Sequence, residues 1–414
     1  MGDDYSLHTQ VVLLFSILLP EFAAMLIIGG FGNVKQAVHA RGSRVRIAMI
    51  GTRGVPARYG GFETAVEEIG SRLVAAGHQV RVYCRGAADR QDEHKGMRLV
   101  HLPALRHKVL ETLSHTALSV GHLLAHRTDV ALVFNAANSP LLPLIRAARI
   151  PVATHVDGLE WKRDKWSGVG RRYYLAAERL SVRWSHAIIA DARAIQDYYR
   201  KRYEIGSVLI SYGAPIQDGP NSDLLAQAGY EPGRFHLVVA RFEPENHVAE
   251  IVEGYARSRA EYPLVVVGSA PYAAEYTERV RRIVGADPRI RLVGGVWDQE
   301  LLDAMYAGCA SYLHGHSVGG TNPSLLRAMG AGAPVIAYDV VFNREVLAET
   351  GAFFSDEASL AETLEAAEKR RDQEAARGAA ARERARTAYR WDDVAARYER
   401  LCHDLAAGRA PVEE

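Results

Sequence analysis

The feature that most constrains the fold is a regular alternation, from Val45 onward, of short apolar runs with amphipathic stretches. Such alternation predicts βαβ units, in which parallel strands form a sheet covered by helices. A polar stretch from Gln217 to Gly233, rich in Gly, Pro, Asn and Asp, interrupts the alternation, which then restarts. The chain is therefore predicted to be an α/β protein with two Rossmann-like, doubly wound parallel-sheet domains. We expect strands at 46–51, 79–84, 98–103, 130–134, 151–155, 187–190 and 208–211, then at 235–240, 264–268, 290–293, 311–314 and 334–338.

This pattern divides the chain into four segments. An N-terminal extension (1–44) precedes a first domain (45–218), a second domain (219–390) and a C-terminal helix (391–414) that could cross back to the first domain. The length of 414 residues, with 48% hydrophobic and 24% charged, suits two globular domains with real cores. Two open parallel sheets in series create a central cleft between the carboxyl ends of their strands, where ligands bind.

Charge and cysteine content exclude some classes of protein. A net charge of +1 argues against nucleic acid as a partner. Cys84, Cys309 and Cys402 are distant in sequence and odd in number, so neither a disulfide framework nor a paired-cysteine metal site is indicated. A reducing, cytoplasmic location is consistent with this composition.

The N-terminal extension contains an almost unbroken apolar run from Val11 to Phe31. About 20 such residues can span a bilayer. The first basic residue, Lys35, follows the run rather than preceding it, which is not the pattern of a signal peptide and would leave the rest of the chain cytoplasmic. Pro20 and Glu21 interrupt the run, so the segment is either a membrane anchor or an extension that never inserts.

A glycine-rich loop, Gly51 to Thr64, connects the first predicted strand to a helical pattern. Free N–H groups and the helix dipole make such a loop an anion site, and Arg53 and Arg58 add positive charge. The spacing is neither GxGxxG nor a P-loop, which disfavours nicotinamide binding and simple NTPase activity. The alternative interpretation is a tight turn without a ligand.

A second glycine-rich segment, His314 to Val335, follows a strand of the second domain. Asn322 can cap a helix that has Pro323 at its first position, and the N–H groups of this helix start would form another anion site. Arg241, at the end of the first strand of that domain, can bind phosphate oxygens with two parallel hydrogen bonds. Two anion sites facing one cleft are what a nucleoside diphosphate leaving group requires.

These motifs resemble those of glycosyltransferase family 4. The resemblance rests on Gly60-Gly61-Phe62-Glu63, on Arg241 with Glu245, and on the segment from Ala328 to Val335. The runs 51–64, 155–161 and 314–326 are similar to the bacterial rhamnosyltransferase branch of that family. The resemblance extends from about residue 45 to residue 401.

The resemblance implies a GT-B fold and a retaining transfer that needs neither metal nor cofactor. It implies a donor, dTDP-L-rhamnose in this branch, bound by the second domain, and a lipid-linked or polysaccharide acceptor bound by the first, in cell-surface glycan synthesis. The catalytic residues implied are His155, which would contact the transferred sugar, Glu63 and Arg241. The other donor-binding residues implied are Gly60, Gly61, Gly320, Thr321, Asn322, Ser324 and Arg327. The acceptor-binding residues implied are Arg58, Tyr59, Glu63 and Asp157.

The chain departs from the family pattern at donor-binding positions. Asn246 stands where a lysine is usual, and Gly319 and Arg327 stand where a pair of glutamates eight residues apart is usual. The second glutamate would accept ribose hydroxyls, whereas arginine has five donors and no acceptor. We expect Arg327 to turn toward the phosphates and partly replace the missing lysine.

One further segment and two rival functions complete the predictions. Residues 161–166 and 171–174 interleave aromatic and basic side chains. This pattern suits contact with anionic lipid headgroups at the inner membrane surface or with an acceptor diphosphate, and a solvated helix is the alternative. His107, His115, His122 and His126 lie on a predicted helix without carboxylate or cysteine partners at ligand spacing, so no metal site is expected.

Two rival functions remain alongside sugar transfer. A nucleotide-sugar epimerase would need paired acid and base groups, and the sequence shows none. A nucleotide-sugar-binding protein with weak or no activity is suggested by Asn246 and Arg327.

Overall fold

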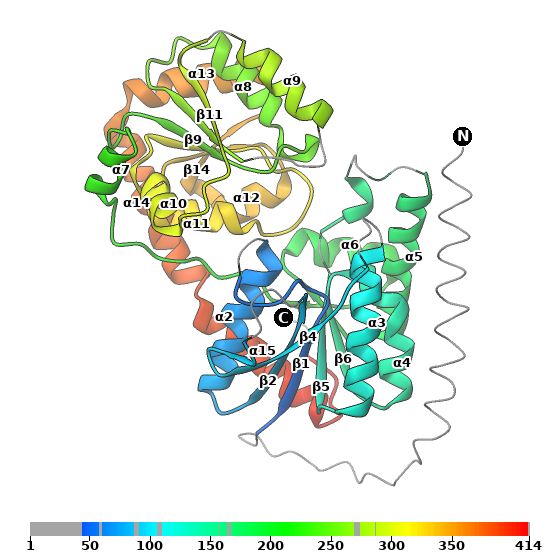
Figure 1. Ribbon diagram of the computed structural model, residues 1–414. Coiled ribbons are helices and arrows are strands. Elements are labelled where there is room, and N and C mark those ends of the chain that lie inside the picture. Colours follow the sequence, from blue (N-terminus) through cyan, green and yellow to red (C-terminus); the bar gives the residue numbers. More distant parts are fainter. Residues whose placement is uncertain are drawn as a thin grey trace.

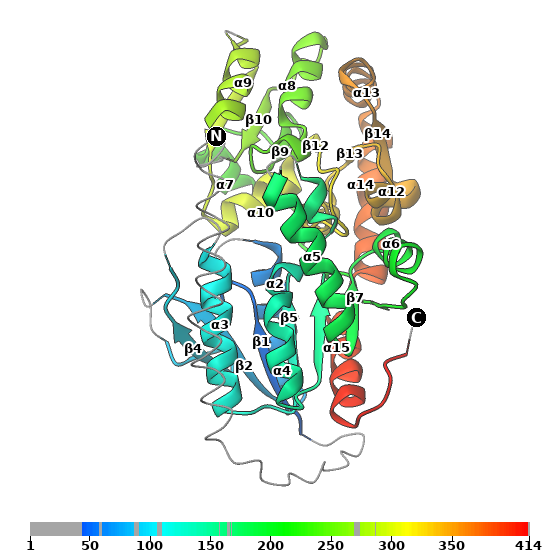
Figure 2. The ribbon, with the colours of Figure 1, turned by 90° about the vertical axis from the view of Figure 1, so that its right-hand side faces the viewer.

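The computed structural model describes residues 44–57, 60–86, 91–105, 110–156, 158–163, 166, 168–268, 274–285 and 287–412. Two α/β halves lie one above the other, with helices α14 and α15 running down one side of both (Figures 1 and 2). The apolar run 11–31 lies outside the described residues. Within them, no helix combines the length and apolar character that crossing a membrane requires.

The first half is a sheet of order β3-β4-β2-β1-β5-β6-β7-β8. Its strands are β1 (Arg46–Ile50), β2 (Gln79–Arg85), β3 (Glu93–His94), β4 (Met97–Leu102), β5 (Val130–Phe134), β6 (Val152–His155), β7 (Ala187–Ala190) and β8 (Val208–Leu209). All neighbouring pairs are parallel except β3 with β4. Along β1, Ile47 and Met49 belong to one apolar cluster, and Ala48 and Ile50 to another on the opposite face. The strand is therefore apolar from Ile47 to Ile50, as expected for a parallel sheet covered on both faces.

The second half is a parallel sheet of order β11-β10-β9-β12-β13-β14. Its strands are β9 (His236–Val239), β10 (Leu264–Val267), β11 (Ile290–Gly294), β12 (Ser311–His314), β13 (Val335–Tyr338) and β14 (Gly351–Phe354). One face packs on helices α8 (Val248–Arg257), α9 (Ala274–Val284) and α13 (Glu357–Lys369). The other packs on α10 (Gln299–Gly308), α11 (Pro323–Ala331) and α14 (Arg371–Ala388).

Most helices of the first half flank its sheet. Helix α2 (Gly61–Ala75) covers one face, while α3 (Leu110–Ala125) and α4 (Leu142–Ala147) cover the other. Helices α5 (Gly168–Trp184) and α6 (Arg193–Tyr203) follow β6 and β7. Each predicted strand overlaps a strand of the structure, and β3 and β14 are additional.

The predicted linker is partly helical. Asn221 caps α7 (Ser222–Gln227) through a hydrogen bond from Leu224 N. Leu225 is fully buried, and its side chain lies against Gly308 of α10. A polar stretch with one buried leucine therefore joins the second half as a packed element rather than as a free connection.

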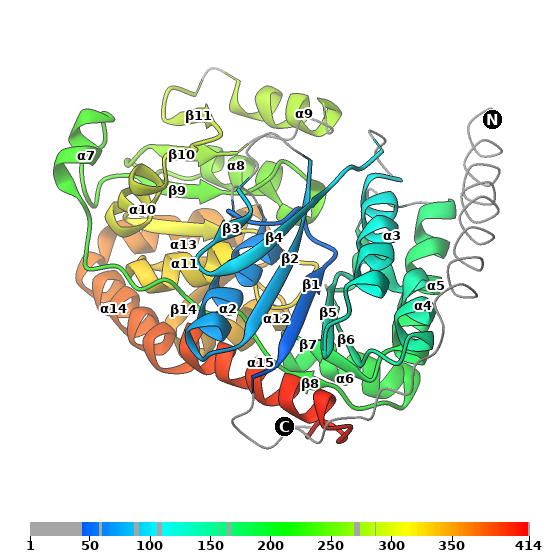
Figure 3. The ribbon, with the colours of Figure 1, turned by 60° about the horizontal axis from the view of Figure 1, so that its bottom comes forward.

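The C-terminal helix α15 (Trp391–Ala406) lies on the first half of the molecule, next to α2. Figure 3 shows it along the underside of the first sheet. Arg72 of α2 pairs with Asp392 at 2.8 Å, and His78 pairs with Glu399 at 3.0 Å. Trp391 packs against Gly213, where a side chain would collide with the indole.

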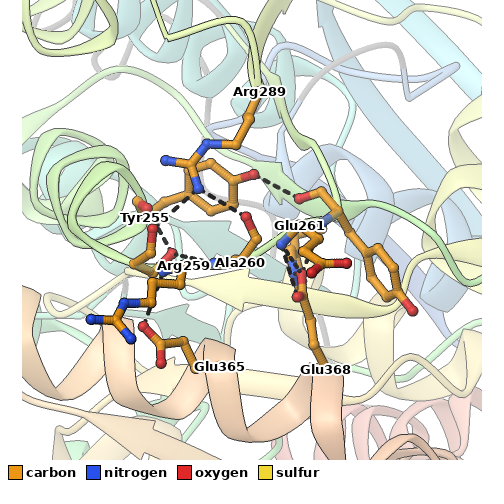
Figure 4. A network of polar contacts seen from close by, with 10 residues as sticks. Tyr255, Arg259, Ala260, Glu261, Arg289, Glu365 and Glu368 are labelled. Atoms are coloured by element: carbon orange, nitrogen blue, oxygen red, sulfur yellow. Dashed lines mark hydrogen bonds and ion pairs between the residues drawn. The ribbon is translucent and has the colours of Figure 1, made fainter.

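A polar network lies at the amino ends of β9 and β10, next to α13 (Figure 4). The Glu368 carboxylate accepts hydrogen bonds from Glu261 N, Tyr262 N and His236 Nε2. Arg289 donates to the carbonyl oxygens of Ser258 and Ala260 and lies over the ring of Tyr255. The loop between α8 and β10 is thereby held through its backbone groups, a structural role remote from the cleft.

Candidate active site

A cavity of about 2030 Å³ lies between the carboxyl ends of the two sheets. The loop after β1 and the start of α2 line it from the first half. The ends of β9 and β12 and the start of α11 line it from the second half. The predicted central cleft is therefore present.

The loop after β1 is shaped by Glu63 at the start of α2. Glu63 Oε1 accepts a hydrogen bond from Arg53 N at 2.9 Å. A side chain at Gly60, whose φ is +112°, would collide with the other carboxylate oxygen, so glycine is required there. Gly61 approaches Pro323 of α11 across the cavity, and an added Cβ would lie 2.9 Å from its ring. Glu63 thus positions the loop, and its predicted contact with an acceptor hydroxyl stays a prediction.

The helix start in the second half is less open to an anion than predicted. Asn322 caps α11 and Pro323 occupies its first turn, as the sequence indicated. The N–H of Ser324, however, donates to Asn322 Oδ1 at 2.9 Å, and that of Thr321 donates to Asp191 Oδ2 at 3.1 Å. Proline has no N–H. The N–H groups of Thr321 and Ser324 are therefore occupied in this arrangement, and binding of a diphosphate by the helix start stays a prediction.

The two halves meet in close contact beside this loop. Thr321 Oγ1 donates to the carbonyl oxygen of Asp191 at 2.6 Å. A Cβ at Gly320 would overlap the Asp191 carboxylate, and one at Gly158 would overlap the backbone of Gly319. The glycines of this segment, Gly320 included, allow the first half to approach the loop between β12 and α11.

His155 is not where its predicted role requires. Its residue exposure is 2%, and it does not belong to the cavity wall. The ring is stacked on Tyr212 and lies edge-on to Phe62, while Nδ1 is 2.7 Å from Tyr398 Oη. Burial lowers the pKa of His155 to about 3, so the ring is neutral. His155 is a core residue beneath the cavity, and its assignment as a sugar-contacting residue is corrected.

Arg241 lies in the cavity wall with 41% of its side chain exposed. Its nearest carboxylate is Glu243, at 3.4 Å. Asn246, which replaces the usual lysine, is buried; it donates from Nδ2 to Arg241 O at 2.8 Å and contacts His316 Nδ1 through Oδ1 at 2.7 Å. Arg241 can therefore reach a phosphate, while Asn246 orders the loop that carries it.

Arg327 does not turn toward the phosphates. Its Nε donates to Asp303 Oδ1 at 2.7 Å, and Nη1 donates to Gln299 Oε1 at 2.9 Å. Its guanidinium also lies over the ring of Tyr306. Arg327 is thus held on α10, and the predicted replacement of the missing lysine is corrected.

Several residues of the cavity had no individual role among the sequence-based predictions. Arg163 is 8% exposed; it pairs with Glu160 at 2.7 Å and lies 3.8 Å from Glu245 of the second half. Asp191 and His316 also line the wall. Their positions just after strands β6, β7 and β12 were the available signal, because loops leaving the carboxyl ends of parallel strands meet in the cleft.

The basic and aromatic segment divides between cavity and surface. Trp166, Arg172, Tyr173 and Tyr174 line the cavity, and Tyr173 Oη donates to Ala137 O at 2.5 Å. Arg171 instead lies over the ring of Trp161. The cavity-lining part is therefore not a wholly solvated helix, and contact of this segment with a membrane stays a prediction.

Histidines elsewhere have structural contacts. His122 stacks on His126, and His115 is fully buried, while 107 lies outside the described residues. His78, Glu399 and His403 could in principle hold a metal, since their ligand atoms lie within 4.8 Å of one another. Val45 N donates to His78 Nδ1, however, which leaves the ring proton on Nε2, facing Glu399. These residues are better described as a hydrogen-bonded contact between His78 of the first half and helix α15.

Three of the predicted acceptor-binding residues, Arg58, Tyr59 and Asp157, lie outside the described residues.

Comparisons with known proteins agree with this geometry. A family model described as a glycosyl transferase 4-like domain matches residues 60–210, and one described as glycosyl transferases group 1 matches residues 234–369. No curated protein sequence matches the chain. Sucrose-phosphate synthase from Thermosynechococcus elongatus is a similar solved structure, with a TM-score of 0.75, 21% identity, and coverage of 88% of this chain and 100% of that one.

Two other solved structures share the fold. HepE from Anabaena, in complex with UDP-glucose, has a TM-score of 0.70 and 18% identity, with coverage of 85% of this chain and 98% of that one. WaaG, a glycosyltransferase involved in lipopolysaccharide biosynthesis, has a TM-score of 0.63 and 18% identity, with coverage of 86% and 99%. The two family models together match more than half of the chain. It therefore belongs to the glycosyltransferases of the GT4 type and is a nucleotide-sugar-dependent glycosyltransferase with the GT-B fold.

Proposed function

We propose that the enzyme transfers L-rhamnose from dTDP-L-rhamnose to a lipid-linked or polysaccharide acceptor in cell-surface glycan synthesis. The transfer retains the anomeric configuration and needs no metal. The observation that carries the proposal is the position of Arg241, partly exposed in the wall of a cavity that the glycine-rich segments of both halves also line. The similarity of the runs 51–64, 155–161 and 314–326 to the rhamnosyltransferase branch supports the choice of sugar.

Arg241 supplies the charge that the leaving group needs. As the bond between the sugar and the diphosphate breaks, negative charge develops on the phosphate oxygens, and a guanidinium held nearby stabilises it. In the first half, Glu63 accepts from Arg53 N, and Glu67 accepts from Lys95 and Ala57 N. Carboxylates occupied in this way are poorly placed as the general base of an inverting reaction, which supports retention.

The decisive experiment is a transfer assay with a panel of nucleotide sugars. The full chain is incubated with dTDP-rhamnose, UDP-glucose or GDP-mannose, with and without membrane extract as the source of acceptor. We expect release of dTDP that depends on the extract, and loss of that release by at least about 100-fold in Arg241→Gln. Arg279→Gln, a change on the outer helix α9, is the matched control. Epimerised donor, or binding without turnover in all mixtures, would refute the proposal.

Mechanism and location need separate measurements. Proton NMR of the isolated product reports the anomeric configuration, and full activity in the presence of EDTA would support metal independence. We further propose that the enzyme works at the inner membrane surface, where cavity-lining Trp166 and Arg172 face the acceptor. Flotation with anionic vesicles, compared between the full chain and a chain lacking residues 1–44, tests this; absence of both chains from the vesicle fraction would refute it.

A further inference from the structure

One wall of the cavity has a composition that phosphate binding does not explain. It is formed by α10 and the loop before it, and it carries Trp297, Gln299, Asp303, Tyr306 and Arg327. Trp297 is 67% exposed, although large aromatic side chains are usually buried. An exposed indole next to amide and carboxylate groups offers a stacking surface beside hydrogen-bonding groups, which suits a nucleoside.

Asp303 is held in one orientation on this wall. Its Oδ1 accepts hydrogen bonds from Arg327 Nε at 2.7 Å and from Gln217 Nε2. With 40% of the side chain exposed and both of these contacts on Oδ1, Oδ2 is available to a ligand in the cavity. A carboxylate offers acceptors only, and its partners on a ligand are therefore hydroxyl or N–H groups.

Arg327 serves this carboxylate rather than an anion. Its Nη1 and Nη2 donate to the side-chain and backbone oxygens of Gln299, at 2.9 and 3.3 Å. The guanidinium is therefore bound on three sides by α10 and is not directed at a phosphate. Arg327 stands where a glutamate that accepts ribose hydroxyls is usual. Its presence there is explained if it orients Asp303, which then accepts such a hydrogen bond.

We propose that Asp303, oriented by Arg327, accepts a hydrogen bond from a free pentose hydroxyl of the donor nucleoside, with the base against Trp297. A carboxylate that binds pentose hydroxyls is a recurring solution in nucleotide sites of α/β folds. Asp303 is then a binding residue and Arg327 a positioning residue. The inference rests on the proposed function in one respect only, that the donor is a nucleoside diphosphate sugar.

The test separates the nucleoside end of the ligand from its phosphate end. Binding of dTDP, UDP and inorganic pyrophosphate to the full chain is measured by calorimetry, for the wild type and Asp303→Asn. The amide keeps the shape of the side chain but replaces one acceptor by a donor. We expect nucleoside diphosphate affinity to fall about tenfold or more, with unchanged pyrophosphate affinity. An analogue of UDP that lacks both pentose hydroxyls should bind the two proteins equally.

Arg327→Met tests the positioning role. Removing the guanidinium releases Asp303, so we expect KM for the donor to rise with little change in kcat, and Arg327→Lys to restore part of the loss. Asp287→Asn, on the outer edge of the second sheet, is the matched control. Unchanged nucleoside diphosphate affinity in Asp303→Asn, or an equal loss of pyrophosphate, would overturn the inference. Nucleoside binding through Asp303 without sugar transfer would refute the proposed function and leave this inference standing.

Discussion

The contact between Gly320 and Asp191 makes the substitution Gly320→Ala a direct test of whether the two halves must close for catalysis. A Cβ at this position would lie within 3.0 Å of Asp191 Cγ and of both carboxylate oxygens. Rotation of the carboxylate would cost the hydrogen bond that Oδ2 accepts from Thr321 N, while the bond from Thr321 Oγ1 to the Asp191 carbonyl holds the backbone close. We therefore expect the loop carrying Gly320 to separate from the first half.

The cost follows from these contacts. Forcing an extra methyl group into a packed site costs about 1–3 kcal/mol, and losing a hydrogen bond to a charged group costs about 1.5–3 kcal/mol. The closed arrangement is thus disfavoured by about 2.5–6 kcal/mol, or a factor of roughly 60 to 20,000 at 1.4 kcal/mol for each tenfold change. If transfer requires the closed arrangement, kcat should fall by at least about tenfold, and the radius of gyration from small-angle scattering should increase.

A second variant separates the loss of closure between the halves from damage to the loop that carries Gly320. In the double variant with Asp191→Ala the collision is absent, although the hydrogen bond from Thr321 N to the Asp191 carboxylate is lost as well. We expect the double variant to be more active than Gly320→Ala alone, with a radius of gyration closer to that of the wild type. Wild-type kcat and dimensions in Gly320→Ala, or a double variant as impaired as the single one, would refute the reasoning.

Other predictions concern the buried polar groups. Tyr398→Phe leaves Nδ1 of buried His155 without its partner and should lower the free energy of unfolding by about 1–3 kcal/mol, measured by urea titration; an unchanged midpoint would contradict it. His155→Phe should change donor KM less than threefold or so, because the ring is not part of the cavity wall, and a large rise in KM would restore a direct role. Burial tends to raise the pKa of Glu368, but hydrogen bonds from His236 and two backbone N–H groups outweigh it and lower the pKa. Glu368 therefore stabilises the fold above its unfolded-state pKa of about 4.3 and loses this contribution as the pH falls through its lower folded-state pKa. The stability difference between wild type and Glu368→Gln should shrink in acid below about pH 4, and a constant difference in pH-dependent melting would be inconsistent with this.

Much of the fold was predictable because apolar periodicity records which backbone segments are buried. The strands of both sheets and the capping of α11 by Asn322 follow from local sequence. Strand β3 has only two residues and carries no such pattern. Helix α7 escaped prediction because it is short and only Leu225 of its residues is fully buried.

The site was harder to predict because its properties depend on side-chain direction and on contacts between the halves. The position of His155 at the end of β6 suggested a residue facing the cleft, but Phe62 and Tyr212 lie against its ring and it is excluded from the wall. Arg327 was assigned to phosphate from its charge, whereas a partner on α10 determines its direction. Asp191 was missed because its contact lies 130 residues away in the chain.

The return of α15 to the first half also determines how the molecule can move. The chain passes between the halves twice, once after β8 and once between α14 and α15, and the two passages are bonded to each other by Ala214 N and Tyr389 O at 2.7 Å. Two adjacent crossings form a hinge. They permit rotation of one half relative to the other about the line that joins them, and they resist sliding or twisting of the two halves. Opening should therefore be a swing that separates the halves most on the side farthest from Trp391, so that substrates enter and products leave from that side.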